Sequence, residues 1–159
     1  MIRFAAFVCA LLLATPALAV PKLESSVIEP TLEQCLTAAA TRGDNQSGPV
    51  LTDCISAGSN ACQNEDTSPS SSVIIRCDGE ELMFWQSLIA FETDQLHKSL
   101  KPQGLLALRA SEKAWTAWKD ARCDFVRKSE TDAKTMGVDV SYCLMETTAL
   151  RAIDLLIAL

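Results

Sequence analysis

Residues 105–123 read LLALRASEKAWTAWKDARC, and the helix predicted by this stretch decides the fold. Four of its residues fall on one stripe at helical spacing: Leu108, Trp115, Trp118 and Arg122. Because two tryptophans on one face carry a large apolar area, we expect neighbouring helices to cover both of them. The stretch ends at Cys123, which can join this helix covalently to another segment.

The N-terminus has the three-part pattern of a secretory signal peptide. A basic start precedes an apolar run from Phe4 to Ala14, and small residues precede a cleavage site after Ala19. A membrane anchor is the alternative, but the run is shorter than the about 20 residues that span a bilayer. We therefore expect a periplasmic or secreted protein that has no membrane contact once the signal is removed. The expected division is a signal peptide at 1–19, a lead-in at 20–30 and a single helical domain at 31–159.

The charge of the mature chain restricts its partners. The full sequence carries a formal charge of −6, and removal of residues 1–19 takes away Arg3 and no acid, which leaves 13 basic and 20 acidic residues and a charge of −7. Nucleic acid and anionic lipid are poor partners for an acidic protein, because like charges repel. A basic protein partner is favoured.

Six cysteines remain after Cys9 leaves with the signal, and an even number in an exported chain predicts three disulfides. A metal site is the alternative, but there is no C-x-x-C pair and His97 is the only histidine of the sequence. Six cysteines allow fifteen connectivities. The favoured pairs are Cys123 with Cys143, followed by Cys35 with Cys54 and Cys62 with Cys77.

The N-terminal third is expected to hold only short helices. A capping box at Thr31–Gln34 opens one that stops near Gly43, and Pro49 starts another that ends near Gly58. Residues 64–72 are polar and rich in serine, which favours a loop.

Three long helices follow. The first is expected at 79–101, with Asp78 and Glu81 as capping residues and Trp85 on its apolar face. The second runs from the break at Pro102 to about Lys128, and the third from about Asp139 to the C-terminus. No alternating strand pattern is present in the sequence. The fold class is therefore all-α, a small disulfide-stapled bundle of three long antiparallel helices.

No pattern in the sequence predicts an enzyme or a cofactor site. His97 lies on the polar side of its helix, without the nucleophile and acid that a catalytic histidine requires. Glu80 and Glu81 diverge by about 100° on a helix, so a solvated or capping role is expected for them. Asp120 and Arg151 are expected to form a charge-assisted bond that sets helix register, with a binding site as the alternative.

The same residues carry a resemblance to a known family. Residues 108–123 have the pattern L-R-x-x-x-x-A-W-x-x-W-K-D-A-x-C, and residues 143–151 have C-L-x-x-x-T-x-x-R. Together they resemble the lysozyme inhibitor LprI-like N-terminal domain family. The exported members are similar also in the residues that precede this stretch: Cys54, Ile55, Cys62, Cys77, Glu81 and Trp85. The chain departs from the family's usual residues at Gln86, Ile89, Ala90, Thr93 and Lys119.

The resemblance implies a small, exported, all-helical domain, and lysozyme inhibition is attached to the family through a few of its members. With the acidic charge, this leads us to expect a protein-binding domain that inhibits a lysozyme-type muramidase, with a basic lysozyme as the partner. No inhibitory residue can be carried over from the family. The alternative is an envelope structural domain that self-associates. Its dimer would form through the last helix, ALRAIDLLIAL, which is apolar nearly all round except at Arg151 and Asp154 and is therefore either buried or part of a dimer face.

Overall fold

The computed structural model describes residues 27–41 and 50–158, so the expected signal peptide, Gly43 and Pro49 lie outside the described residues. Within these ranges the chain forms helices and no strand. The elements are α1 (Ile28–Ala40), the 3₁₀ helix η1 (Leu51–Cys54), α2 (Ala57–Gln63), α3 (Ser71–Ser99), α4 (Pro102–Ser129) and α5 (Ala133–Leu156). The expected all-α class is confirmed.

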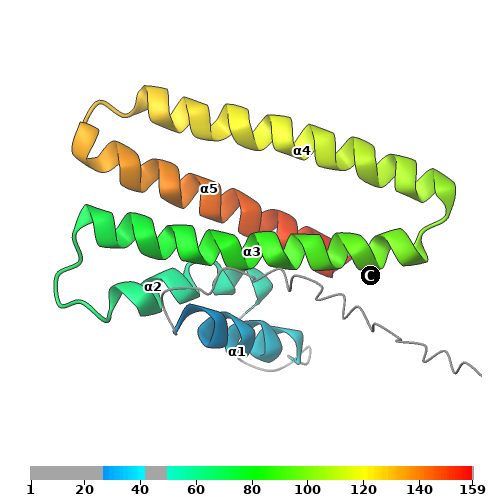
Figure 1. The fold of residues 1–159 in the computed structure, drawn as a ribbon, viewed down its shortest axis with the longest axis horizontal. Coiled ribbons are helices and arrows are strands. Elements are labelled where there is room, and N and C mark those ends of the chain that lie inside the picture. Colours follow the sequence, from blue (N-terminus) through cyan, green and yellow to red (C-terminus); the bar gives the residue numbers. More distant parts are fainter. Residues whose placement is uncertain (1–26, 42–49, 159) are drawn as a thin grey trace, which may run out of the picture.

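The three long helices form a layered bundle with α5 in the middle (Figure 1). Consecutive helices run antiparallel, so α3 and α5 run in the same direction (Figure 1). Helix α5 packs against both α3 and α4, whereas α1, η1 and α2 pack on the side of α3 away from α4. An all-round apolar helix takes the central place because it can bury both of its faces.

The central position of α5 favours the buried alternative for the last helix over a dimer face. Along α5 the side chains that face α3 and α4 are buried: Cys143, Met145, Thr147, Thr148, Ala149, Ala152, Ile153 and Leu155. The helix also begins at Ala133, one and a half turns before the expected start near Asp139. Most of its apolar surface is therefore part of the protein core, and Ile157, just past the end of the helix, remains 69% exposed.

The starts of α1 and α3 differ from the capping signals in the sequence. Helix α3 begins at Ser71, where the Ser70 side chain accepts a hydrogen bond from the backbone N–H of Val73. The expected capping residues Asp78 and Glu81 therefore lie inside the helix, and both are buried. Helix α1 begins at Ile28, before the expected capping box at Thr31, because burial of Ile28 and Leu32 outweighs the local capping preference.

Three disulfides staple the bundle. Cys35–Cys54 joins α1 to η1, Cys62–Cys77 joins α2 to α3, and Cys123–Cys143 joins α4 to α5. The Cα–Cα distances are 5.7, 5.8 and 5.7 Å. These are the three pairs that the order of the cysteines favours, and each closes a loop between elements that are neighbours in the chain.

Two glycines provide a matched test of the packing between α1 and α2. Gly58 was expected to end a helix but lies inside α2, where a Cβ would come within 2.9 Å of Ile28 Cγ2 and 3.1 Å of Leu32 Cδ1. A Cβ on Gly79 of α3 would meet no atom within 4 Å. Both neighbours of Gly58 are fully buried, so they cannot move aside without repacking the core.

We therefore expect Gly58→Ala to lower the free energy of unfolding by about 1–2 kcal/mol through overpacking. Gly79→Ala should raise it by up to about 1 kcal/mol, because alanine favours a helix interior. Urea denaturation of the two variants measures both effects. Equal effects at the two positions would contradict the close approach of α2 to α1.

Candidate protein-binding site

A buried carboxylate fixes α2 onto α3. Glu81 Oε1 accepts hydrogen bonds from the backbone N–H of Ser56 (2.8 Å) and from Trp85 Nε1 (2.9 Å), and Oε2 accepts one from the backbone N–H of Ser59 (2.6 Å). Burial raises the pKa of Glu81, while these hydrogen bonds act in the opposite direction and the nearby Asp78 raises it further. Glu81 therefore holds the start of α2 from the neighbouring helix.

Asp78 extends the same network to α5. It accepts hydrogen bonds from the Ser59 hydroxyl at 2.5 Å and from the Ser141 hydroxyl at 2.8 Å. The expectation of a solvated or capping role is wrong for Glu80 and Glu81, since both are buried; Glu80 pairs with Arg76 at 2.7 Å. Burial with several partners marks these acids as structural groups rather than a substrate site.

The three tryptophans are exposed to different degrees. Trp85 is fully buried, as expected, and packs edge-on against Phe84. Trp115 is half-buried, and Trp118 is 48% exposed, so the expectation that Trp118 faces the core is wrong. Helix α4 packs mainly on α5, and a single neighbour covers only a narrow stripe of it.

The expected pair of Asp120 and Arg151 does not form. Asp120 is exposed and lies 3.8 Å from Lys119 Nζ, whereas Arg151 Nε donates to Glu112 Oε1 at 3.0 Å. The disulfide explains the difference, because α4 and α5 are antiparallel on either side of Cys123–Cys143. Arg151 lies eight residues after Cys143, so on the antiparallel α4 it is level with Trp115, eight residues before Cys123. Glu112 is within one helical turn of Trp115.

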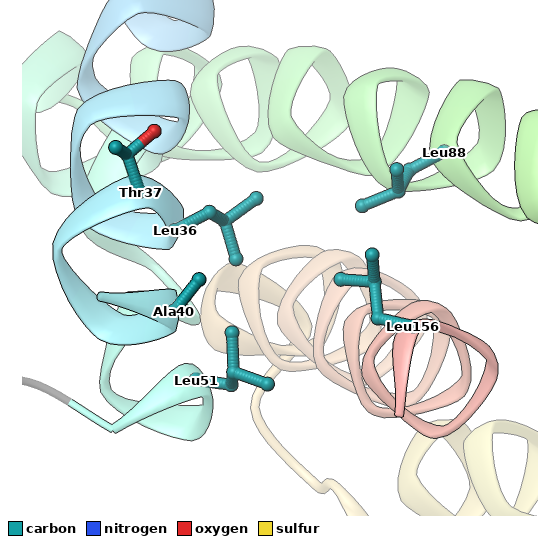
Figure 2. Close-up of a pocket in the computed structure, with 6 residues that line it drawn as sticks. All are labelled: Leu36, Thr37, Ala40, Leu51, Leu88 and Leu156. Atoms are coloured by element: carbon teal, nitrogen blue, oxygen red, sulfur yellow. The ribbon is translucent and has the colours of Figure 1, made fainter. Parts of the chain in front are cut away.

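An apolar pocket opens between the N-terminal elements and the core (Figure 2). It has a volume of about 330 Å³. Side chains from α1, η1, α3 and the end of α5 converge on it: Leu36, Thr37, Ala40, Leu51, Leu88 and Leu156. Leucines dominate the lining, so the pocket suits an apolar side chain, or the aliphatic stem of a long basic one. No spacing signal in the sequence marks these residues, because they come from four separate elements.

Two acids lie close in sequence to residues that line this pocket. Glu33 lies one helical turn before Thr37, and Asp53 lies two residues after Leu51. Both acids are exposed. We refer to the pocket and these two acids as the N-terminal face.

Charge is distributed unevenly between the two sides of the bundle. The described residues 27–41 and 50–70 carry five exposed acids and no basic residue: Glu29, Glu33, Asp53, Glu65 and Asp66. Helix α4, on the opposite side (Figure 1), has six basic residues against three acids. The N-terminal face therefore presents the surface that attracts a basic protein.

The described residues contain no group of three His, Cys, Asp or Glu side chains placed to hold a metal ion. His97 is exposed on α3. No helix in the described ranges has the length and apolar character needed to cross a membrane.

Comparison with known proteins identifies the family. The family model described as lysozyme inhibitor LprI matches residues 62–155, which is more than half of the chain and includes α3, α4 and nearly all of α5. No curated protein and no solved structure matches the chain. The matched stretch contains Glu81, Trp85 and the Cys123–Cys143 disulfide, which hold the bundle together. The chain therefore belongs to the lysozyme inhibitor LprI family.

Proposed function

We propose that this protein inhibits a basic, lysozyme-type muramidase by binding it as a protein partner. The observation that carries the proposal is the family match over residues 62–155. Charge adds support, because the described residues 27–41 and 50–70 carry five exposed acids and no basic residue, and acidic charge attracts a basic enzyme and speeds its encounter.

We propose the N-terminal face as the contact surface. An open apolar pocket of about 330 Å³ next to Glu33 and Asp53 fits a projecting basic or apolar side chain of the partner. Interfaces commonly combine an apolar anchor in a pocket with a polar rim. The pocket is built from α1 and η1, which precede the matched residues, as well as from Leu88 and Leu156. We therefore propose this contact surface for the present protein only and do not extend it to the other members of the family.

We also propose that the protein is exported, with residues 1–19 removed. The three disulfides support this, because disulfides persist in oxidising compartments. The signal-like pattern of the N-terminus agrees with export. The substrate of a muramidase is cell-wall material, so an inhibitor acts where the enzyme meets the wall.

The test is an inhibition assay with the oxidised mature protein and a basic lysozyme. We expect inhibition that weakens as salt is added, since salt screens attraction between exposed charges. Glu33→Lys should weaken inhibition about fivefold, which corresponds to the loss of one charged contact. Asp94→Lys, the same charge change at an exposed position on α3, serves as the matched control and should leave inhibition within about twofold of wild type.

A second variant tests the pocket. Ala40 is exposed and lines the pocket, so Ala40→Phe should fill the space without disturbing the core, and it should abolish inhibition. Inhibition that survives both Glu33→Lys and Ala40→Phe would place the contact elsewhere on the protein. No inhibition by the folded wild-type protein at micromolar concentrations would reject the proposed function itself.

A further inference from the structure

Helix α4 exposes three large apolar side chains on its outer side and on the flank where Trp118 packs against Arg122. Leu106 is 66% exposed, Trp118 48% and Phe125 70%. These residues lie on about 30 Å of helix, and the described residues place no element over them. A surface of this kind commonly marks a protein contact, because exposed aromatic residues cost solubility unless they bind something. We call this surface the α4 outer face.

Small residues run between these large ones. Five exposed alanines occur at alternating steps of three and four: Ala107, Ala110, Ala114, Ala117 and Ala121. This spacing keeps them on one stripe of the helix. A stripe of methyl groups lets a second helix approach closely, while Trp118 and Phe125 project beside it.

Charged residues flank the alanine stripe, with the basic residues in the first half of the helix and the acidic residues in the second half. Arg109 and Lys113 precede the middle of the helix, and Asp120 and Asp124 follow it, all on the same flank. Arg109 and Asp124 are equally far in sequence from the bond between residues 116 and 117, and so are Lys113 and Asp120. Arg109 and Lys113 form no ion pair with another described residue, and the Asp120 contact with Lys119 is a loose 3.8 Å. Asp124 pairs with Arg127 at 3.3 Å and with Lys128 at 2.6 Å on its own helix, so Arg109 of a second copy would join this cluster.

We propose that the α4 outer face binds the α4 outer face of a second copy, with the two helices antiparallel about a two-fold axis near residue 116. In an antiparallel pair the same flank of each helix meets its counterpart in reverse order. Lys113 of one copy therefore faces Asp120 of the other, and Arg109 faces Asp124. The symmetry repeats each contact, so the interface has four opposite-charge pairs and no like-charge pair on this flank.

The alanine pairs are centred on the bond between residues 115 and 116, one residue before the centre of the charge pairs. Ala110 faces Ala121 of the other copy, and Ala114 faces Ala117, which brings the two helix backbones together along the stripe. On the other flank Trp118 lies over Ser111 of the second helix, and Phe125 lies over Ala107. Trp118 and Phe125 thus each meet a small side chain, which is the condition for close packing of two helices.

This self-complementarity is the reason for choosing a second copy over an unrelated protein. A partner of another sequence would not require that charges and side-chain sizes on α4 mirror one another about centres that lie within two residues of one another. The dimer goes beyond the proposed muramidase inhibition and does not depend on it. Helix α1, which carries part of the N-terminal face, lies on the opposite side of the bundle from α4 (Figure 1), so the α4 contact leaves both copies of this face open.

Charge reversal tests the register. Sedimentation velocity of the oxidised mature protein at 1–100 µM, as a rough range, should show a dimer that dissociates on dilution. Lys113→Asp places two like-charge contacts across the axis, and Asp120→Lys does the same, so each should weaken the dimer about tenfold or more. The double variant Lys113→Asp/Asp120→Lys restores both opposite-charge pairs and should dimerise like wild type. Lys98→Asp, an equal charge change on exposed α3, is the control and should have no effect.

A second measurement tests proximity at the axis. Ala117 is exposed, so Ala117→Cys should fold normally and form an intermolecular disulfide with its own counterpart under mild oxidation, whereas Ala90→Cys on α3 should not. A monomer at every concentration, or a dimer indifferent to the charge reversals, would overturn the proposal. So would a muramidase complex that is lost in Trp118→Ala while the free protein stays monomeric. These sedimentation measurements contain no muramidase, so their outcome is separate from that of the inhibition assay.

Discussion

Replacing Glu81 with glutamine is expected to lower the free energy of unfolding by about 2–4 kcal/mol. The two carboxylate oxygens of Glu81 accept from Ser56, Ser59 and Trp85 in a site without exposed surface. In glutamine one of these two oxygens is replaced by an NH₂ group. The NH₂ group can only donate, so it cannot accept the hydrogen bond from the N–H group that points at it. One buried N–H therefore loses its partner, and α2 loses its attachment to α3. Asp94→Asn, on the exposed side of α3, is the control and should change stability by no more than about 0.5 kcal/mol.

The pH dependence of the same pair of proteins gives an independent check. Burial raises the pKa of Glu81 in the folded state above its value in the unfolded chain, so the folded protein holds this proton to higher pH. As pH rises from the unfolded pKa through the raised folded pKa, the contribution of Glu81 to stability falls. The stability advantage of wild type over Glu81→Gln should therefore be larger at acid pH than at neutral pH. An advantage that grows with pH would show that the hydrogen bonds outweigh burial.

Removing the Cys123–Cys143 disulfide is expected to cost about 3 kcal/mol, and the loss should be concentrated in α4. The cysteines are 20 residues apart, and closing a loop of that length removes about this much free energy from the unfolded chain. In α4 only Leu108 and Cys123 are buried, so little apolar packing holds this helix to the bundle. The double variant Cys123→Ser/Cys143→Ser should therefore keep α3 and α5 together while α4 opens.

Hydrogen exchange followed along the chain measures this effect. In the double serine variant the amides of α4 should exchange much faster, while those of α3 and α5 keep most of their protection. Cys62→Ser/Cys77→Ser is the matched control, because it opens a loop of 15 residues between α2 and α3 and leaves the attachment of α4 intact. Uniform loss of protection in both variants would mean that α4 belongs to the same cooperative unit as the core.

The helical class and the covalent links could be predicted from the sequence because both depend on local spacing. Hydrophobic residues at steps of three and four identified the long helices, and the order of the cysteines favoured the pairs that form. The starts of α1 and α3 could not be predicted from capping signals. Asp78 and Glu81 have the residue types of helix caps, but their partners come from α2 and α5, which no local pattern reveals.

The orientation of α4 could not be predicted because it depends on how many helices surround it. A stripe with two tryptophans indicates a core-facing surface when neighbours lie on both sides, but α4 packs mainly on α5 and leaves Trp118 half exposed. The pairing of Arg151 with Glu112 required the register that the disulfide imposes. The candidate pocket was missed for the same reason, since Leu36, Leu51 and Leu88 meet only in the folded chain.

The order of the three disulfides has a consequence for how the protein is made. The six cysteines from Cys35 onward pair in the order in which they occur, first with second, third with fourth and fifth with sixth. When the polypeptide emerges from its N-terminus, the partner of each unpaired thiol is therefore the next cysteine to appear. An oxidase that acts on thiols in their order of appearance produces the native bonds, and shuffling by an isomerase becomes unnecessary. We expect the yield of native protein in a producing cell to depend on a dithiol oxidase and to be indifferent to loss of a disulfide isomerase.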